Sequence, residues 1–284
     1  METSDFYGTE KVSRILLKIA PPVMLAQLIQ ALYNIVDSFF VGKYSETGLT
    51  ALSIIYPVQL LMIALGVGTG VGINTDMAYY LGIGKKKKAE EVAGTGTPLG
   101  LILWIIFAAV CYVTLPAYAG MSTDSPEVIR DVVAYGRIVC LFSIGLFTEG
   151  IWSKILQAEG DMRTPMIAQI AGAVINIILD PLLIFGMLGM PEMGISGAAV
   201  ATVSGQIVAA LIVMKKAWYR SPRRSCYPGH IKRIYQLGIP NIIMQSAYTL
   251  YILGLNLILA GFSDQAVTAL GLYYNCLLYT SDAA

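Results

Sequence analysis

The sequence is poor in charge, in histidine and in paired cysteine. Only 13% of its 284 residues are Asp, Glu, Lys or Arg, about half of the ~25% typical of soluble domains. Its single histidine, His230, leaves no material for a histidine-based catalytic triad or a zinc site. The four cysteines have neither metal nor redox spacing. With 56% hydrophobic residues and a mean hydropathy of +0.66, these absences indicate an all-α polytopic membrane protein.

Seven apolar stretches approach the ~20 residues that a helix needs to cross the hydrocarbon core. The second is longer than one span and is expected to continue beyond the membrane. Residues 1–10 are polar and acidic, so we expect no signal peptide. The predicted spans are 14–41, 49–82, 92–116, 132–156, 164–187, 194–215 and 235–260, with an eighth beginning near 266.

The distribution of basic residues among the loops between the spans predicts the orientation of the chain in the membrane. If the spans alternate in direction, sixteen of the 19 Lys and Arg residues fall on one side, including the run from Lys85 to Lys88. Only Lys43, Arg130 and Arg137 fall on the other side. By the positive-inside rule the N-terminus is cytoplasmic. We therefore expect a multi-pass protein of the inner, cytoplasmic membrane, in contact with lipid. We also expect it to be monomeric and to have no nucleic-acid partner.

Two acidic residues lie deep in apolar stretches. Asp180 follows Asn176 by four residues, so both occupy one face of a helix, and Pro181 removes a backbone hydrogen bond beside the acid. Asp37 lies equally deep in the first span. An intramembrane carboxylate is costly and is by default functional, and two close carboxyls in low dielectric cannot both carry charge cheaply. We interpret Asp37, Asn176 and Asp180 as one polar site; the alternative is a hydrogen bond that only holds the bundle.

The depth of these side chains follows by counting residues along each span. The first and fifth spans run outward, so Asp37 and Asp180 both lie in the outer half of the membrane. The sixth span runs inward and brings Thr202 and Gln206 to a matching depth. Thr202 is therefore added to the polar site, and Gln206 to the lining of a cavity.

Other polar residues extend this prediction. We expect three residues shortly before Asp37 to line the cavity and Pro22 to act as a hinge or static bend in the first span. Asp76 and Glu149 are predicted to lie at the inner membrane interface, Glu149 near Lys154, with the inner vestibule as the alternative. The three cavity residues are Gln30, Tyr33 and Asn34.

The chain also contains an internal repeat. A shift of 218 positions pairs Pro22 with Pro240 and residues 50–52 with 268–270, without a gap. Six spans separate the copies, so they share one orientation, as parallel repeats do. We expect a six-helix lobe over 1–214, a basic cytoplasmic loop over 215–234, and the start of a second lobe over 235–284. The polar end of that lobe falls at mid-membrane, which predicts truncation within the second lobe.

With these residues placed, the chain resembles the multidrug and toxic compound extrusion (MATE) family of cation-coupled antiporters, within the prokaryotic branch that includes DNA-damage-inducible proteins. The resemblance covers essentially residues 10–275. It rests on Pro22 with Val36-Asp37-Ser-Phe-Phe-Val-Gly42, on Gly66-Val-Gly-Thr-Gly70 before Leu81-Gly82, on Gln157-Ala-Glu-Gly160-Asp161 with Arg163-Thr-Pro165, on Asn176 through Pro181, and on Gly194-Ile-Ser-Gly197-Ala-Ala-Val-Ala-Thr202.

The resemblance implies a two-lobe transporter with a central cavity and a coupling ion, H⁺ or Na⁺, bound in the first lobe by Asp37, Asn176 and Asp180. It implies organic, often cationic, drugs or toxic compounds as substrates and no cofactor besides the ion. Three alternatives stay open. A lipid-precursor flippase would favour basic cavity residues, an intramembrane aspartyl hydrolase would use Asp37 and Asp180, and a truncated chain would be inert.

Overall fold

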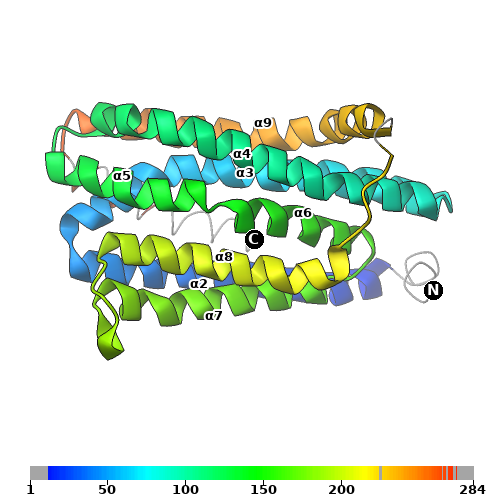
Figure 1. The fold of residues 1–284 in the computed structure, drawn as a ribbon, viewed down its shortest axis with the longest axis horizontal. Coiled ribbons are helices and arrows are strands. Elements are labelled where there is room, and N and C mark those ends of the chain that lie inside the picture. The colour runs from blue at the N-terminus through cyan, green and yellow to red at the C-terminus, as the bar shows by residue number, and fades with distance from the viewer. Residues whose placement is uncertain (1–11, 224–225, 264, 267, 271–272, 274–284) are drawn as a thin grey trace.

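The computed structural model describes residues 12–223, 226–263, 265–266, 268–270 and 273. These residues form long helices that run side by side along the longest axis of the molecule (Figure 1). The 1–10 segment and the polar tail from Thr280 to Ala284, on which two sequence predictions depend, lie outside the described residues. The elements are α2 (Val12–Tyr44), α3 (Glu46–Gly82), α4 (Lys86–Ser122), α5 (Pro126–Leu141), α6 (Ile144–Ala158), α7 (Arg163–Ile184), the 3₁₀ turn η1 (Met187–Gly189), α8 (Ile195–Ala217) and α9 (Tyr227–Ala260).

These helices confirm the predicted spans, with one difference. Within the described residues, six helices are long and apolar enough to cross a membrane, and seven spans result if α5 and α6 count as one. The stretch 132–156, predicted as one helix, breaks after Leu141, and its two halves meet at 45°. Ser143 lies at the break and its hydroxyl donates to the carbonyl of Cys140 at 2.8 Å, which satisfies one backbone group that the break exposes.

Helices α3 and α4 are both longer than a membrane requires. Each has 37 residues, or about 55 Å at the α-helical rise, against a hydrocarbon core of roughly 30 Å. The overrun predicted for the second span is confirmed, and α4 shares it because helix extends back to Lys86 through the lysine run. Gly84 joins the two helices with a φ of 73°, a left-handed conformation that glycine adopts without steric cost.

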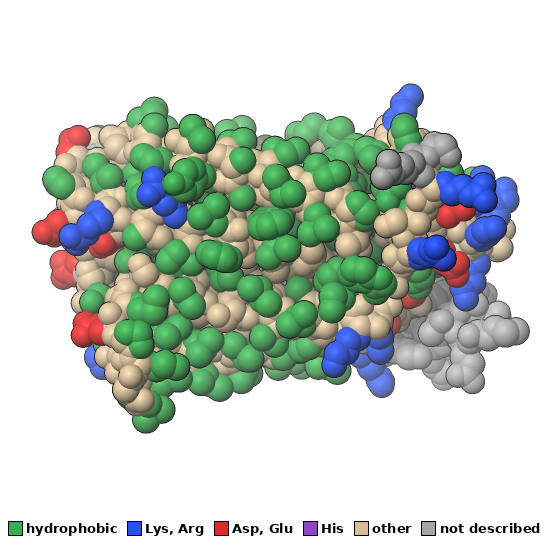
Figure 2. Space-filling view, viewed as in Figure 1, with side chains coloured by type: hydrophobic (Ala, Val, Ile, Leu, Met, Phe, Trp, Pro, Cys, Tyr) green, Lys and Arg blue, Asp and Glu red, His purple; other side chains and the backbone are tan. Residues whose placement is uncertain are grey.

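Helix α3 is the centre of one part of the bundle, and α7 of the other. Helix α3 packs against α4, α6 and α9, whereas α7 packs against α2 and α8 and α6 bridges to α8. Large apolar side chains fill the spaces between these helices; Ile54, Phe147 and Ile155 are among the fully buried ones. Apolar side chains also cover the outer surface over its middle, as Figure 2 shows, which suits a lipid-facing belt.

Charged side chains gather at the two ends of the bundle. One end, here called the basic end, holds the α3–α4 turn, the α6–α7 loop and the α8–α9 linker, where most of the described Lys and Arg residues lie. In Figure 2 this end is on the right, and Asp and Glu side chains are prominent at the left. The separation of charge that the positive-inside argument uses is therefore present in the folded chain.

The basic stretch 215–234 differs from the loop that was predicted. Helix α8 continues to Ala217 and α9 begins at Tyr227, so only 218–226 separates the two helices. Lys215 and Lys216 belong to the last turn of α8, where positive side chains favour the negative end of the helix dipole. Four of the six described lysines and arginines of this region, Lys215, Lys216, Lys232 and Arg233, are therefore helical residues.

Two residues that the internal repeat pairs are in contact in the structure. Thr50 and Thr268, which the shift of 218 positions pairs, contact each other through their hydroxyl oxygens at 2.8 Å. Two equivalent residues meet in this way when they lie beside the axis that relates the copies. The contact agrees with the repeat, which stays a prediction. Asp264 and Tyr274, which the same shift pairs with Glu46 and Tyr56, lie outside the described residues.

Glycines bring α9 against α3. A Cβ atom on Gly238 would come within 2.6 Å of the carbonyl oxygen of Gly68, and one on Gly72 would collide with the carbonyl of Ile234. Only small residues permit such backbone contact between membrane helices. The approach also buries Asp76, whose side chain is 0% exposed and pairs with Arg233 of α9 at 2.5 Å, Oδ1 to Nε. Its interfacial depth stays a prediction.

Asp161 ties the start of α7 to the end of α8 at the basic end. It accepts from the backbone N–H and the hydroxyl of Thr164 at 3.0 and 2.7 Å and from Lys216 at 3.0 Å. Gly160, with a φ of 86°, provides the turn before it. These contacts give the Gln157-Ala-Glu-Gly160-Asp161 motif a structural role in joining two helices.

This arrangement predicts a pH effect on stability. Partial burial raises the pKa of Asp161, but the hydrogen bonds from Thr164 and Lys216 outweigh it and hold the pKa below the ordinary 3.8. The stabilisation is therefore present above that value and lost as the pH falls through the lower folded-state pKa. As the pH falls from about 5 to 3, we expect the unfolding temperature of Asp161→Asn to decrease by less than that of the wild type. Thermal unfolding at each pH measures this difference. A pH dependence as steep as that of the exposed-site control Asp124→Asn would contradict the assignment.

Candidate functional site

The close approach of α7 and α8 builds the site. A Cβ atom on Gly172 would lie 2.7 Å from the carbonyl oxygen of Gly205, and one on Gly205 would lie 2.5 Å from the carbonyl oxygen of Gly172. Two helices in backbone contact bring their neighbouring side chains together as well. Asn176 and Thr202, one turn from this contact on either helix, therefore lie next to each other.

We expect Gly205→Ala to destabilise the protein, by about 1–3 kcal/mol as overpacking does, because the new methyl group has no space against Gly172. The measurement is thermal or denaturant unfolding of the purified protein in detergent. Gly254→Ala is the matched control, since a Cβ atom there meets nothing within 4 Å. Equal stability of the two variants would show that the helices do not meet as described.

Asn176 links the acid of its own helix to α8. With its amide nitrogen toward Asp180 Oδ2 at 3.3 Å and its oxygen toward the backbone N–H of Thr202 at 3.2 Å, both ends of the amide are satisfied. In the opposite orientation the nitrogen lies 3.4 Å from both Asp180 Oδ1 and Thr202 Oγ1. Either way, Asn176 bridges the two residues that sequence placed at its depth.

Asp37 of α2 completes the group of four residues, here called the outer site. It is 7% exposed, and Asp180, Asn176 and Thr202 are 0%, 2% and 6% exposed. Asp37 and Asp180 are close enough to interact electrostatically. Among the described residues, Asp37 Oδ1 has no hydrogen-bond partner. A buried carboxylate oxygen without a partner is costly, so the outer site has an open acceptor position.

Two residues that the sequence reasoning missed, Tyr135 of α5 and Gln59 of α3, border the outer site. The hydroxyl of Tyr135 accepts from Gln59 Nε2 at 3.2 Å, and it also contacts Thr202 and lies near Asp37. Tyr135 is 1% exposed. Nothing in the local sequence distinguishes this tyrosine from the others of an apolar span, because its role follows only from which way α5 faces.

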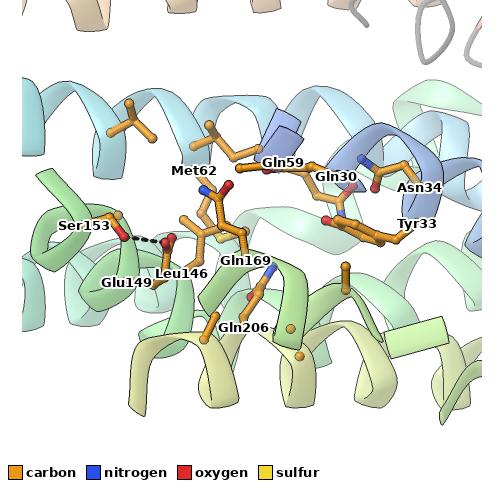
Figure 3. Close-up of a pocket in the computed structure, with 18 of the residues that line it drawn as sticks. Gln30, Tyr33, Asn34, Gln59, Met62, Leu146, Glu149, Ser153, Gln169 and Gln206 are labelled. Carbon is orange, nitrogen blue, oxygen red and sulfur yellow. Dashed lines mark hydrogen bonds between the residues drawn. The ribbon is translucent and has the colours of Figure 1, made fainter. Parts of the chain in front are cut away.

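A cavity of about 690 Å³ extends from the outer site between α2, α3, α6, α7, α8 and α9. Asp37, Asn176 and Thr202 line it, whereas Asp180 does not and lies behind Asn176. All residues predicted for the cavity and the hinge line it as well, and Figure 3 shows Gln30, Tyr33 and Asn34 of α2 across the cavity from Gln206. They are Pro22, Gln30, Tyr33, Asn34 and Gln206; their roles in transport, including the hinge at Pro22, stay predictions.

Glu149 faces the cavity, which agrees with the inner vestibule given as the alternative and not with the interfacial position that was predicted. Glu149 lines the cavity together with Ser153 and Lys154, and Ser153 Oγ donates to its carboxylate at 2.6 Å (Figure 3). Gln157, one further turn along α6, also lines the cavity. Polar residues spaced by four along one helix share a face, so residues 149, 153 and 157 carried a signal for a polar stripe on α6 that the sequence reasoning did not use.

Comparison with known proteins connects this geometry to a family. A family model described as MatE matches residues 22–182. The "Probable multidrug resistance protein NorM" of Thermotoga maritima is 28% identical over 243 residues, which cover 82% of this chain and 52% of that protein. The "FAD transporter" of Shewanella oneidensis is 27% identical over 70% of this chain and 44% of that protein. The chain thus spans about half the length of these curated relatives.

Solved structures agree with the fold. The MATE multidrug transporter DinF-BH superposes with a TM-score of 0.87 at 26% identity, over 96% of this chain and 62% of that one. An inward-facing multidrug resistance MATE family transporter superposes with a TM-score of 0.77, also at 26% identity, over 92% of this chain and 60% of that one. The all-α membrane fold predicted from sequence is therefore confirmed.

Proposed function

Because the chain belongs to the MatE family, whose members are transporters rather than enzymes, we propose that it exports organic, often cationic, compounds in exchange for H⁺ or Na⁺. The relatives' names, which include multidrug resistance proteins and an FAD transporter, support export of sizeable organic molecules. The coupling ion binds at Asp37, beside Asn176, Asp180 and Thr202. The substrate occupies the cavity that Gln30, Tyr33, Asn34 and Gln206 line.

One observation supports this most: the cavity is lined by a buried carboxylate with an open acceptor oxygen, Asp37 Oδ1, which interacts electrostatically with a second buried carboxyl, that of Asp180. A proton on this oxygen, or a Na⁺ ion beside it, removes the cost of the unpaired charge. Asn176 and Thr202 contribute further oxygen atoms, which are suitable ligands for Na⁺. Ion binding at this position therefore changes the electrostatics of the cavity wall directly.

Coupling then requires that ion and substrate favour different conformations, because a ligand with equal affinity for two states shifts neither. We infer that binding of the ion to Asp37 allows α2 to repack, with Pro22 supplying compliance where a backbone hydrogen bond is missing. The protein lies in the cytoplasmic membrane with its basic end, and hence its N-terminus, on the cytoplasmic side. It acts as a monomer.

The experiment that tests this function is efflux of a fluorescent organic cation from membrane vesicles that contain the full-length polypeptide encoded by its gene. A pH gradient and a Na⁺ gradient are imposed separately. Efflux that follows one gradient names the ion. Efflux that follows neither gradient would contradict the proposal.

A lipid-precursor flippase is the second candidate, and one observation favours it. Such proteins use basic cavity residues for phosphate groups, and Lys154 lines this cavity. The acids at the outer site oppose the assignment, because they repel phosphate. Transfer of a labelled lipid phosphate between bilayer leaflets in the absence of any ion gradient would support the flippase instead.

A further inference from the structure

The cavity contains a second polar group, separate from the outer site. Helix α6 contributes Glu149, Ser153, Lys154 and Gln157 to its lining, and α7 contributes Gln169. Gly145 packs against the backbone of Gln206, and Gln206 lies one turn along α8 from Thr202. Glu149 is a further turn toward the basic end. The two groups are therefore separated along the bundle by about two helical turns, or ~11 Å.

This inner group holds one acid and one base that do not pair with each other. Glu149 accepts from Ser153 and contacts the Gln169 side chain. Lys154 Nζ donates to Gln157 at 3.0 Å. Glu149 and Lys154 interact electrostatically, but these two described residues form no ion pair within 4.0 Å. The reason is geometric: residues five apart on a helix are about 140° apart around its axis, so their side chains diverge.

The backbone that carries this group is held in place. Asn74 of α3 donates to the carbonyl of Lys154 at 2.8 Å. A Cβ atom on Gly70 would lie 2.9 Å from the carbonyl of Gly150, so α3 and α6 are in backbone contact there. The carboxylate and the ammonium are thus presented to the cavity from a rigid element, as a binding site requires.

An unpaired acceptor lies between the two polar groups. Among the described residues, Gln206 Oε1 has no hydrogen-bond partner, although it is buried. Gln206 lines the cavity next to Gln169, as Figure 3 shows. A ligand N–H that points at this oxygen is placed one turn from the Glu149 carboxylate, so the two acceptors suit one cationic nitrogen group.

Resting on the function proposed above, we propose that Glu149 and Lys154 form a substrate subsite that takes the two opposite charges of a zwitterionic organic molecule. The cationic nitrogen group lies against Glu149 and Gln206 Oε1, and the carboxylate lies against Lys154. A substrate with a positive charge alone meets Glu149 favourably but Lys154 unfavourably. The subsite therefore selects among organic compounds by their charge pattern, independently of the ion at Asp37.

The test uses two dyes that share one ring system. An N-alkylrhodamine free acid carries a cation and a carboxylate, whereas its ethyl ester carries the cation alone. Binding to the chain in lipid nanodiscs is measured by fluorescence anisotropy. We expect the wild type to bind the free acid more tightly, and Glu149→Gln to weaken both dyes by about tenfold, which corresponds to ~1.4 kcal/mol.

Lys154→Gln is the variant that separates this subsite from a merely structural pair. It is expected to weaken the free acid by about tenfold and to leave the ester unchanged or more tightly bound. Glu90→Gln and Lys86→Gln make the same chemical changes at exposed positions outside the cavity and control for general charge effects. Parallel effects of Lys154→Gln on both dyes, or no binding of either dye by the wild type, would overturn the subsite.

Vesicle transport distinguishes failure of the subsite from failure of the function. If the full-length polypeptide moves both dyes along an ion gradient and neither variant changes their ratio, the subsite is wrong and the antiporter stands. If ion gradients drive neither dye nor any other organic cation, the antiporter is wrong, whatever the dyes do in the binding assay.

Discussion

In the full-length polypeptide, Asp37→Asn is expected to reduce gradient-driven export by about 10- to 100-fold. This factor lies within the roughly 5- to 150-fold effect that coupling between two binding sites typically has. The substitution keeps the size of the side chain and removes the charge that the coupling ion neutralises. Asp37 is 7% exposed with an open Oδ1 in the described structure, so an amide keeps this position permanently neutral, as a bound proton would.

The measurement is initial efflux rate under the gradient that drives the wild type, together with dye binding in nanodiscs. We expect binding to persist, because the inner group of the cavity is unchanged, while transport ceases to respond to the gradient. Asp124→Asn, an exposed acid outside the cavity, should behave as wild type. Full gradient-driven efflux by Asp37→Asn would refute the coupling mechanism.

Asp180→Asn tests whether Asp180 binds the coupling ion directly or only orients Asn176. Asp180 is 0% exposed and lies behind Asn176 rather than on the cavity wall. If Asp37 and Asp180 share one ion, either substitution abolishes coupling; if Asp180 only orients Asn176, its variant retains partial coupling. The comparison assigns the direct ligand.

Arg233→Met is expected to cause the largest loss of stability, about 3 kcal/mol, at the lower end of the range for breaking a buried ion pair. It removes the charge partner of Asp76, whose side chain is 0% exposed, and neither oxygen of Asp76 makes another hydrogen bond among the described residues. The lower end applies because the Arg233 side chain is 41% exposed, so water screens the pair.

Arg233 also packs over the rings of Tyr79 and Tyr80, at 4.7 and 5.2 Å from their centroids, contacts that methionine replaces only in part. The double variant Asp76→Asn/Arg233→Met should therefore recover most, but not all, of the lost stability. Denaturant unfolding in detergent measures all three proteins. Lys232→Met, the same loss of charge at the exposed neighbouring position, is the control.

If the double variant is no more stable than Arg233→Met alone, the loss comes from the arginine's packing and not from the stranded carboxylate. Because the pair joins α3 of the first repeat to α9 of the second, its strength also determines how firmly α9 is held against α3.

Sequence by itself determined the membrane spans and the separation of charge between the two ends, and it predicted the repeat and a common depth for the outer-site residues. These properties are local or additive along the chain: a span follows from the length of an apolar run, and depth follows from counting at a constant rise per residue. Asn176, Asp180 and Thr202 could thus be placed together although α7 and α8 are separate helices.

Only the tertiary structure decided which way each helix faces. In a soluble helix, polar and apolar faces reveal this rotation, but a membrane helix is apolar toward both lipid and protein, so its sequence carries little of that contrast. Tyr135 beside Thr202, Asp180 behind Asn176 and Lys154 on the cavity wall all depend on rotation. So does the pairing of Asp76 with Arg233, because close contacts at glycines such as Gly68 and Gly238 set the angle at which two helices meet.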